Sequence, residues 1–195
     1  MNRRELLAAL SALGGAACMP VRTADIPPNL PLKGSRQPQL VVQEVGDFQC
    51  PFCADVAPDV DRLMQRYGDR IALVWRNFPL KSHLNAQLAA EAALEVRAQK
   101  GDETFWRYHD VLFAHQDALD GPSLIRYASA FGVDERRMSR ALELGVHAKD
   151  VARDKREIAS LSIPGFGVPT FLIGPDAFVG GYGYDELSAI VEDQL

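Results

Sequence analysis

The sequence has 195 residues, of which 47% are hydrophobic, and its formal net charge at pH 7 is −5. This size and composition fit one globular domain, with room for an insertion. The negative charge gives no basic footprint, so we expect no nucleic-acid partner. Three cysteines are too few for a disulfide-rich scaffold.

Residues 1–18 have the pattern of a secretion signal. Arg3 and Arg4 supply the positive charge at its start, and residues 6–17 form an apolar run that is too short to cross a bilayer as a stable helix. Two refinements stay open: a lipoprotein signal with Cys18 as the lipidated residue, and a twin-arginine signal. In each case we expect an exported protein of the cell envelope, periplasmic or membrane-anchored, where disulfide chemistry is sustained.

Residues 19–38 contain five of the twelve prolines of the chain. A proline-rich segment favours extended backbone and builds no core of its own. We therefore predict a tether that connects the signal to the domain.

Residues 40–45 form a strand-like run, and a helix-like run begins just after Cys50. Cys50 and Cys53 would share one face of the first helical turn, within the Cα separation that a disulfide requires. Pro51 suits the first helical position, where its missing N–H costs nothing. Cys50 then lies at the positive end of the helix dipole, which favours the thiolate that a redox-active cysteine needs.

A structural disulfide and half of a zinc site are the alternatives for this pair. A disulfide that closes so short a loop adds little stability. A zinc site needs two more ligands, and the only other cysteine is Cys18 in the predicted signal, while the four histidines are scattered. Redox chemistry is therefore the favoured interpretation.

The remaining elements alternate in type along the chain. A helix with an apolar face runs from Cys53 to Gly68, and residues 71–75 are a buried strand. Residues 82–162 are helical, with separate apolar faces at 84–96 and 105–113. Two strands follow at 169–173 and 177–179, and a helix at 184–195 closes the chain.

The run Asp47-Phe48-Gln49-Cys50-Pro51-Phe52-Cys53, together with Gly167-Val168-Pro169-Thr170-Phe171, resembles the DsbA-like branch of the thioredoxin superfamily. These proteins are bacterial thiol–disulfide oxidoreductases of the cell envelope. The similarity runs from about residue 39 to the C-terminus. It implies an α/β thioredoxin-like domain at 39–195, with a helical domain inserted at about 82–162 between its two halves.

The resemblance also implies site roles. Cys50 would be the exposed sulfur that contacts substrate, with Pro51 and Phe52 beside it, and Cys53 the buried sulfur that resolves the mixed disulfide. Pro169 would be cis and packed against the pair. It would turn the Val168 backbone outward, so that substrate main chain can pair with it.

Glu44 lies six residues before Cys50 in the predicted central strand. The resemblance makes it a buried proton acceptor for Cys53, with a pKa raised by burial. The alternative is an exposed glutamate on an edge strand. His83 is expected to make a structural hydrogen bond and to have no catalytic role.

We expect no metal or organic cofactor, because the Cys50–Cys53 disulfide itself carries the electrons. The expected function is disulfide formation in exported proteins, with recharging by a membrane redox partner. An envelope reductase or isomerase remains open, as does a chaperone or binding module with an inherited disulfide. Envelope isomerases of this superfamily carry an N-terminal dimerisation domain. The tether leaves no room for one, so we expect a monomer.

Overall fold

The computed structural model describes residues 24–195. The predicted signal and Cys18 lie outside the described residues. The elements in chain order are β1 (Leu32–Gly34), β2 (Leu40–Gly46), α1 (Pro51–Tyr67), β3 (Ile71–Asn77), α2 (Ala86–Ala114), α3 (Gly121–Ser129), α4 (Glu135–Glu143), α5 (Ala148–Ser160), β4 (Thr170–Ile173), β5 (Asp176–Val179) and α6 (Tyr184–Gln194).

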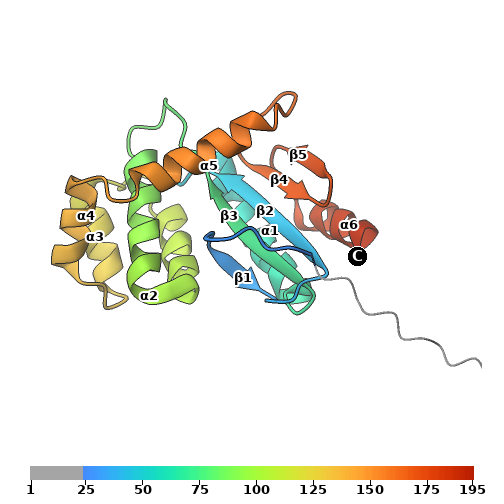
Figure 1. Ribbon diagram of the computed structural model, residues 1–195, viewed down its shortest axis with the longest axis horizontal. Helices are drawn as coiled ribbons and strands as arrows, with labels where there is room; N and C mark the ends of the chain where they lie inside the picture. Colours follow the sequence, from blue (N-terminus) through green and yellow to red (C-terminus); the bar gives the residue numbers. More distant parts are fainter. Residues whose placement is uncertain (1–23) are drawn as a thin grey trace, which may run out of the picture.

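One five-stranded sheet has the strand order β1-β3-β2-β4-β5 (Figure 1). The central strand β2 runs parallel to β3 and antiparallel to β4. The crossover from β2 to β3 passes through α1, as a parallel pair requires. Because β2 is hydrogen-bonded to a strand on each side, its carboxyl end is a well-supported place for a reactive group.

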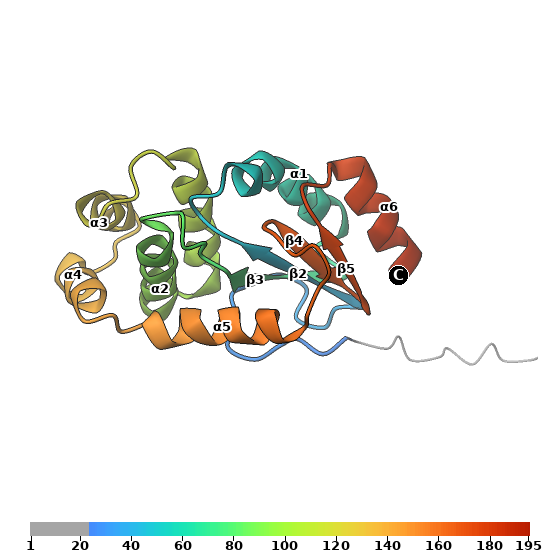
Figure 2. The ribbon, with the colours of Figure 1, turned by 90° about the horizontal axis from the view of Figure 1, so that it is seen from above.

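Helices cover both faces of the sheet (Figure 2). The helices α1 and α6 lie on one face, and α5 lies across the other. The helices α2 to α4 pack beside the sheet, and together with α5 they form the insertion between β3 and β4, which we call the helical insertion (residues 86–160). The predicted thioredoxin fold with a helical insertion is confirmed.

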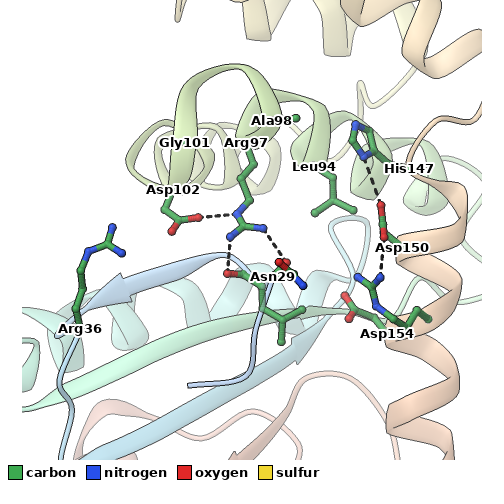
Figure 3. Close-up of a pocket in the computed structure, with 12 residues that line it drawn as sticks. Asn29, Arg36, Leu94, Arg97, Ala98, Gly101, Asp102, His147, Asp150 and Asp154 are labelled. Atoms are coloured by element: carbon green, nitrogen blue, oxygen red, sulfur yellow. Dashed lines mark hydrogen bonds and ion pairs between the residues drawn. The ribbon is translucent and has the colours of Figure 1, made fainter. Parts of the chain in front are cut away.

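One part of the predicted organisation differs from the structure. The prediction of a tether is wrong for residues 24–38, because this stretch contains β1, which pairs with β3. Arg97 of α2 holds the stretch in place by donating to the carbonyl oxygens of Asn29 at 2.7 Å and Leu30 at 2.8 Å (Figure 3). Leu30 is buried as a result.

The two apolar stretches predicted at 84–96 and 105–113 lie on either side of a break at Gly101 within the span α2, so their separation is confirmed. Gly101 has φ +82°, a left-handed conformation that side chains rarely adopt. Asp102 then pairs with Arg97 at 2.6 Å across the break. The change of apolar face along the sequence therefore marks a kink.

Within residues 24–195, no helix combines the length and the apolar character needed to span a membrane.

Candidate active site

Cys50 and Cys53 lie at the junction between the central strand β2 and the helix α1, at the start of the helix. Cys50 is the N-cap residue, and Pro51 occupies the first turn as predicted. Gly46 ends β2 directly against the Trp75 ring, where a Cβ atom would collide with the aromatic carbons. The strand can therefore approach β3 closely at this point, and the following residues 47–50, which we call the active-site loop, turn from strand into helix.

Both sulfurs belong to buried residues, and both cysteines are free thiols in the structure. Cys50 is 3% exposed and Cys53 is 0% exposed. The prediction that Cys50 is an exposed sulfur is therefore wrong, although it remains the more accessible of the two. The physical reason is the loop between α5 and β4, residues 161–169, which we call the Val168 loop. The carbonyl oxygen of Val168 lies 3.6 Å from Cys50 Sγ.

The two thiols differ strongly in acidity. A hydrogen bond from the Cys53 thiol lowers the pKa of Cys50 to about 6, and the backbone N–H groups of Phe52 and Cys53 act in the same direction. The same thiol–thiol hydrogen bond raises the pKa of Cys53, and burial raises it further. Cys50 is therefore the sulfur that is a thiolate near neutral pH.

The second predicted motif lies against the first. The Val168–Pro169 peptide bond is cis, and Pro169 precedes β4, which pairs with β2. The Val168 carbonyl oxygen faces Cys50 Sγ. Pro51 and Phe52 are exposed next to this position, Phe52 at 65%. The structure thus brings the cysteine pair together with Pro51, Phe52, Val168 and Pro169.

Glu44 is buried in β2, at 1% exposure, and not on an edge strand. Neither of its carboxylate oxygens has a hydrogen-bond partner among residues 24–195. Burial is the main cause that raises its pKa to about 8. The charge of Glu44 is the smallest of the influences that raise the pKa of Cys53, after the thiol–thiol hydrogen bond and burial.

The active-site loop is fixed by polar side chains, and the sequence assigned no role to two of them, Asp47 and Gln116. Asp47 is buried and accepts three hydrogen bonds, from the backbone N–H groups of Gln49 and Leu80, each at 2.7 Å, and from His83 Nδ1 at 2.8 Å. The structural hydrogen bond expected of His83 is therefore present. From the opposite side, Gln116 donates to backbone carbonyls of the same loop.

A separate pocket of about 600 Å³ lies between α2, α5 and residues 29–36 (Figure 3). Four of its charged side chains form two ion pairs: Arg97 with Asp102 at 2.6 Å, and Arg153 with Asp150 at 2.9 Å. None of the predicted site residues lines it. Both ion pairs lie within the helical insertion, and Arg97 also links the insertion to the stretch before β1 through its bonds to Asn29 and Leu30.

Residues 24–195 hold no group of three or more histidine, cysteine or carboxylate side chains arranged to bind a metal ion. The polar groups gathered around Cys50 can stabilise a thiolate and move a proton.

Comparison with known proteins places the chain in a family. The family model described as a DSBA-like thioredoxin domain matches residues 41–192. A thioredoxin-like oxidoreductase from Silicibacter pomeroyi superposes with a TM-score of 0.74 at 23% identity, covering 86% of this chain and 92% of that one. BdbD from Bacillus subtilis, in its oxidised form, superposes with a TM-score of 0.73 at 24% identity, covering 85% and 92%.

Longer proteins also contain a similar region. The Na⁺/H⁺ antiporter NhaA 3 of Salinispora tropica is 38% identical over 165 residues, which are 82% of this chain and 24% of that protein. The chain thus spans about a quarter of the length of this relative, and we carry no antiporter activity over to it. The match over residues 41–192 shows that the chain belongs to the DSBA-like thioredoxin domain family, a family of thiol–disulfide oxidoreductases.

Proposed function

We propose that the protein forms disulfide bonds in exported proteins by donating its Cys50–Cys53 disulfide. One observation carries this proposal: the pKa of Cys50 is lowered to about 6 while that of Cys53 is raised. Only the reduced state has a thiolate to stabilise, so stabilising it makes the disulfide a stronger oxidant. A disulfide with only a structural role would not require this difference between the pKa values of its two cysteines.

The first step is the attack of a substrate thiolate on Cys50 Sγ of the oxidised pair. The Cys50–Cys53 bond breaks, a bond between the substrate sulfur and Cys50 forms, and Cys53 leaves with the electron pair. A thiolate on Cys53 is disfavoured because its pKa is raised. Glu44, whose pKa of about 8 keeps it protonated at pH 7, can supply the proton to that sulfur.

The second step releases the product. A second substrate thiolate attacks the substrate sulfur of the mixed disulfide, and Cys50 leaves as a thiolate. With a pKa of about 6, Cys50 is a good leaving group at pH 7, and about nine in ten Cys50 thiols are ionised there. Two electrons have then passed from two substrate thiols to the Cys50–Cys53 pair. In the reverse direction, Glu44 would accept the proton of Cys53.

Substrate main chain would align along the Val168 loop. The Val168 carbonyl faces Cys50 at 3.6 Å, and β4 begins two residues later. An extended peptide that pairs with the Val168 backbone would bring its cysteine beside Cys50. The exposed Phe52 ring would give apolar contact without selecting a particular sequence.

The proposal includes a location and partners. Residues 1–18 would export the protein to the cell envelope, with Cys18 as the site of a lipid anchor in the lipoprotein variant. Exported proteins would be its substrates, and a membrane redox partner would reoxidise the pair. We propose that the protein acts as a monomer.

The direct test is stoichiometric oxidation of a reduced, unfolded secreted protein. The oxidised protein should form disulfides in this substrate within minutes and finish with Cys50 and Cys53 reduced, as counted by mass spectrometry after alkylation. A protein whose disulfide survives this mixture and resists mild reductant would be a binding module with a structural bridge. A protein that reduces insulin much faster than it oxidises the unfolded substrate would be a reductase.

A further inference from the structure

We infer that Gln116 is a positioning residue for the redox pair: from the helical insertion, its amide holds the carbonyl groups of Phe48 and Cys50 and thereby raises the reactivity of Cys50. This inference rests on the proposed exchange at Cys50. It adds a residue that lies 66 positions away in sequence from that cysteine.

The hydrogen bonds are specific. Gln116 Nε2 donates to the Phe48 carbonyl oxygen at 3.0 Å and to the Cys50 carbonyl oxygen at 2.8 Å. Both partners are acceptors, so only the nitrogen of the amide can satisfy them, and the orientation of the side chain is fixed. Among residues 24–195, no other side chain donates a hydrogen bond to the backbone of Cys50.

The Cys50 carbonyl is the first acceptor of α1. It already receives the backbone N–H groups of Cys53 at 3.1 Å and Ala54 at 3.2 Å. Gln116 therefore adds a third donor at the point where the active-site loop becomes helix. This extra bond fixes the peptide plane that follows Cys50, and with it the direction of the N–H groups that face the Cys50 sulfur.

The same bonds act electrostatically. The carbonyl oxygens of Phe48 and Cys50 carry partial negative charge close to the reactive thiolate, and such charge disfavours the ionised sulfur. Donation by Gln116 compensates part of that charge in a partly buried setting, where hydrogen bonds to polar groups have a larger effect than in water. Gln116 should therefore lower the pKa of Cys50 and favour the reduced state.

Backbone hydrogen bonds define the turn that carries Gln116. It lies in the turn after α2, where the His115 N–H bonds to the Leu112 carbonyl at 3.2 Å and the Ala118 N–H bonds to the His115 carbonyl at 3.0 Å. On the other side of the loop, Asp47 and Gln49 anchor residues 80–85. The active-site loop is thus held between two segments, and among the side chains of residues 24–195 Gln116 is the one that bonds the Cys50 carbonyl group.

The test replaces Gln116 with methionine, which keeps the length of the side chain and removes the donor. Loss of these bonds should slow alkylation of Cys50 at pH 6 by about twofold to fivefold, and should lower the oxidising equilibrium constant against glutathione by about threefold to tenfold. Gln116→Glu should give a larger decrease, because a carboxylate repels both carbonyl groups. Its size equals that of glutamine, so it carries the test if the methionine variant does not fold.

Gln99→Met is the matched control. Gln99 is a half-buried glutamine of the same helical insertion, where it bonds Glu95 and Asp134. This variant should leave the alkylation rate of Cys50 unchanged. If the Gln116 variants alkylate and equilibrate as the wild type does, or lose stability equally in both redox forms without a shift in the pKa of Cys50, Gln116 has only a structural role. A wild-type protein without exchange would contradict the proposed function itself, which separates the two failures.

Discussion

The Cys53→Ala variant is expected to accumulate covalent mixed disulfides with its substrates, whereas Cys50→Ala should lose thiol exchange by at least about a thousandfold, as enzymes do when a nucleophile is removed. Cys50 has the lowered pKa, the contact with Val168 and the position beside exposed Phe52. Cys53 lies one turn further inside and is fully buried. Without Cys53, residues 24–195 contain no second thiol that could release a captured substrate.

The measurement is electrophoresis without reductant after mixing each variant with a substrate that contains disulfides, followed by mass spectrometry of the trapped species. Bands that collapse on addition of dithiothreitol confirm that the link is a disulfide. Trapping by Cys50→Ala through Cys53 would reverse the roles of the two sulfurs.

Glu44→Gln should change the pH dependence of stability. Burial raises the pKa of Glu44 to about 8 in the folded protein, against 4.5 for an unburied glutamate. Between these values the folded state keeps a proton that the unfolded state has released. The stability present below pH 4.5 is therefore lost as the pH rises to about 8. The loss is on the order of 3–5 kcal/mol, since one pKa unit corresponds to about 1.4 kcal/mol.

The glutamine variant lacks this titration. Relative to the wild type, it should gain stability from pH 4.5 to pH 8, as measured by denaturant unfolding at several pH values. It should also resolve mixed disulfides more slowly, because no carboxyl group exchanges a proton with Cys53. Glu103→Gln, at the surface, controls for the loss of one charge. If the stability of Glu44→Gln and of the wild type changed with pH in the same way, the pKa of Glu44 would not be raised in the folded protein.

The sequence was sufficient for the fold and for the centre of the site. The spacing of Cys50 and Cys53 at a strand-to-helix junction predicted the redox pair, and the resemblance to DsbA-like proteins implied the burial of Glu44. The spacing of the cysteines is a local feature, because a few adjacent residues determine which side chains share a helical turn.

The remaining features depend on contacts between distant segments. β1 has only three residues and follows several prolines, so its sequence resembles that of a linker. Its order depends on pairing with β3 and on the bond from Arg97 to the Leu30 carbonyl just before the strand. Gln116 is one polar residue in a turn and matches no local pattern. Its role arises only when the helical insertion packs against the active-site loop. The burial of Cys50 likewise depends on the Val168 loop, 118 residues downstream.

The reduction potential of the Cys50–Cys53 pair tests the proposed direction of electron flow most directly. The pKa of Cys50, about 6, lies one unit below the value of about 7 found in thioredoxin. Lowering the pKa of this thiol by one unit stabilises the reduced state by about 1.4 kcal/mol, which raises the reduction potential of a two-electron couple by about 30 mV. Equilibration with glutathione buffers, with both redox forms quantified, should therefore give a potential of about −240 mV, which is more oxidising than that of thioredoxin. A potential at or below that of thioredoxin, about −270 mV, would contradict a disulfide-forming role and indicate a reductase.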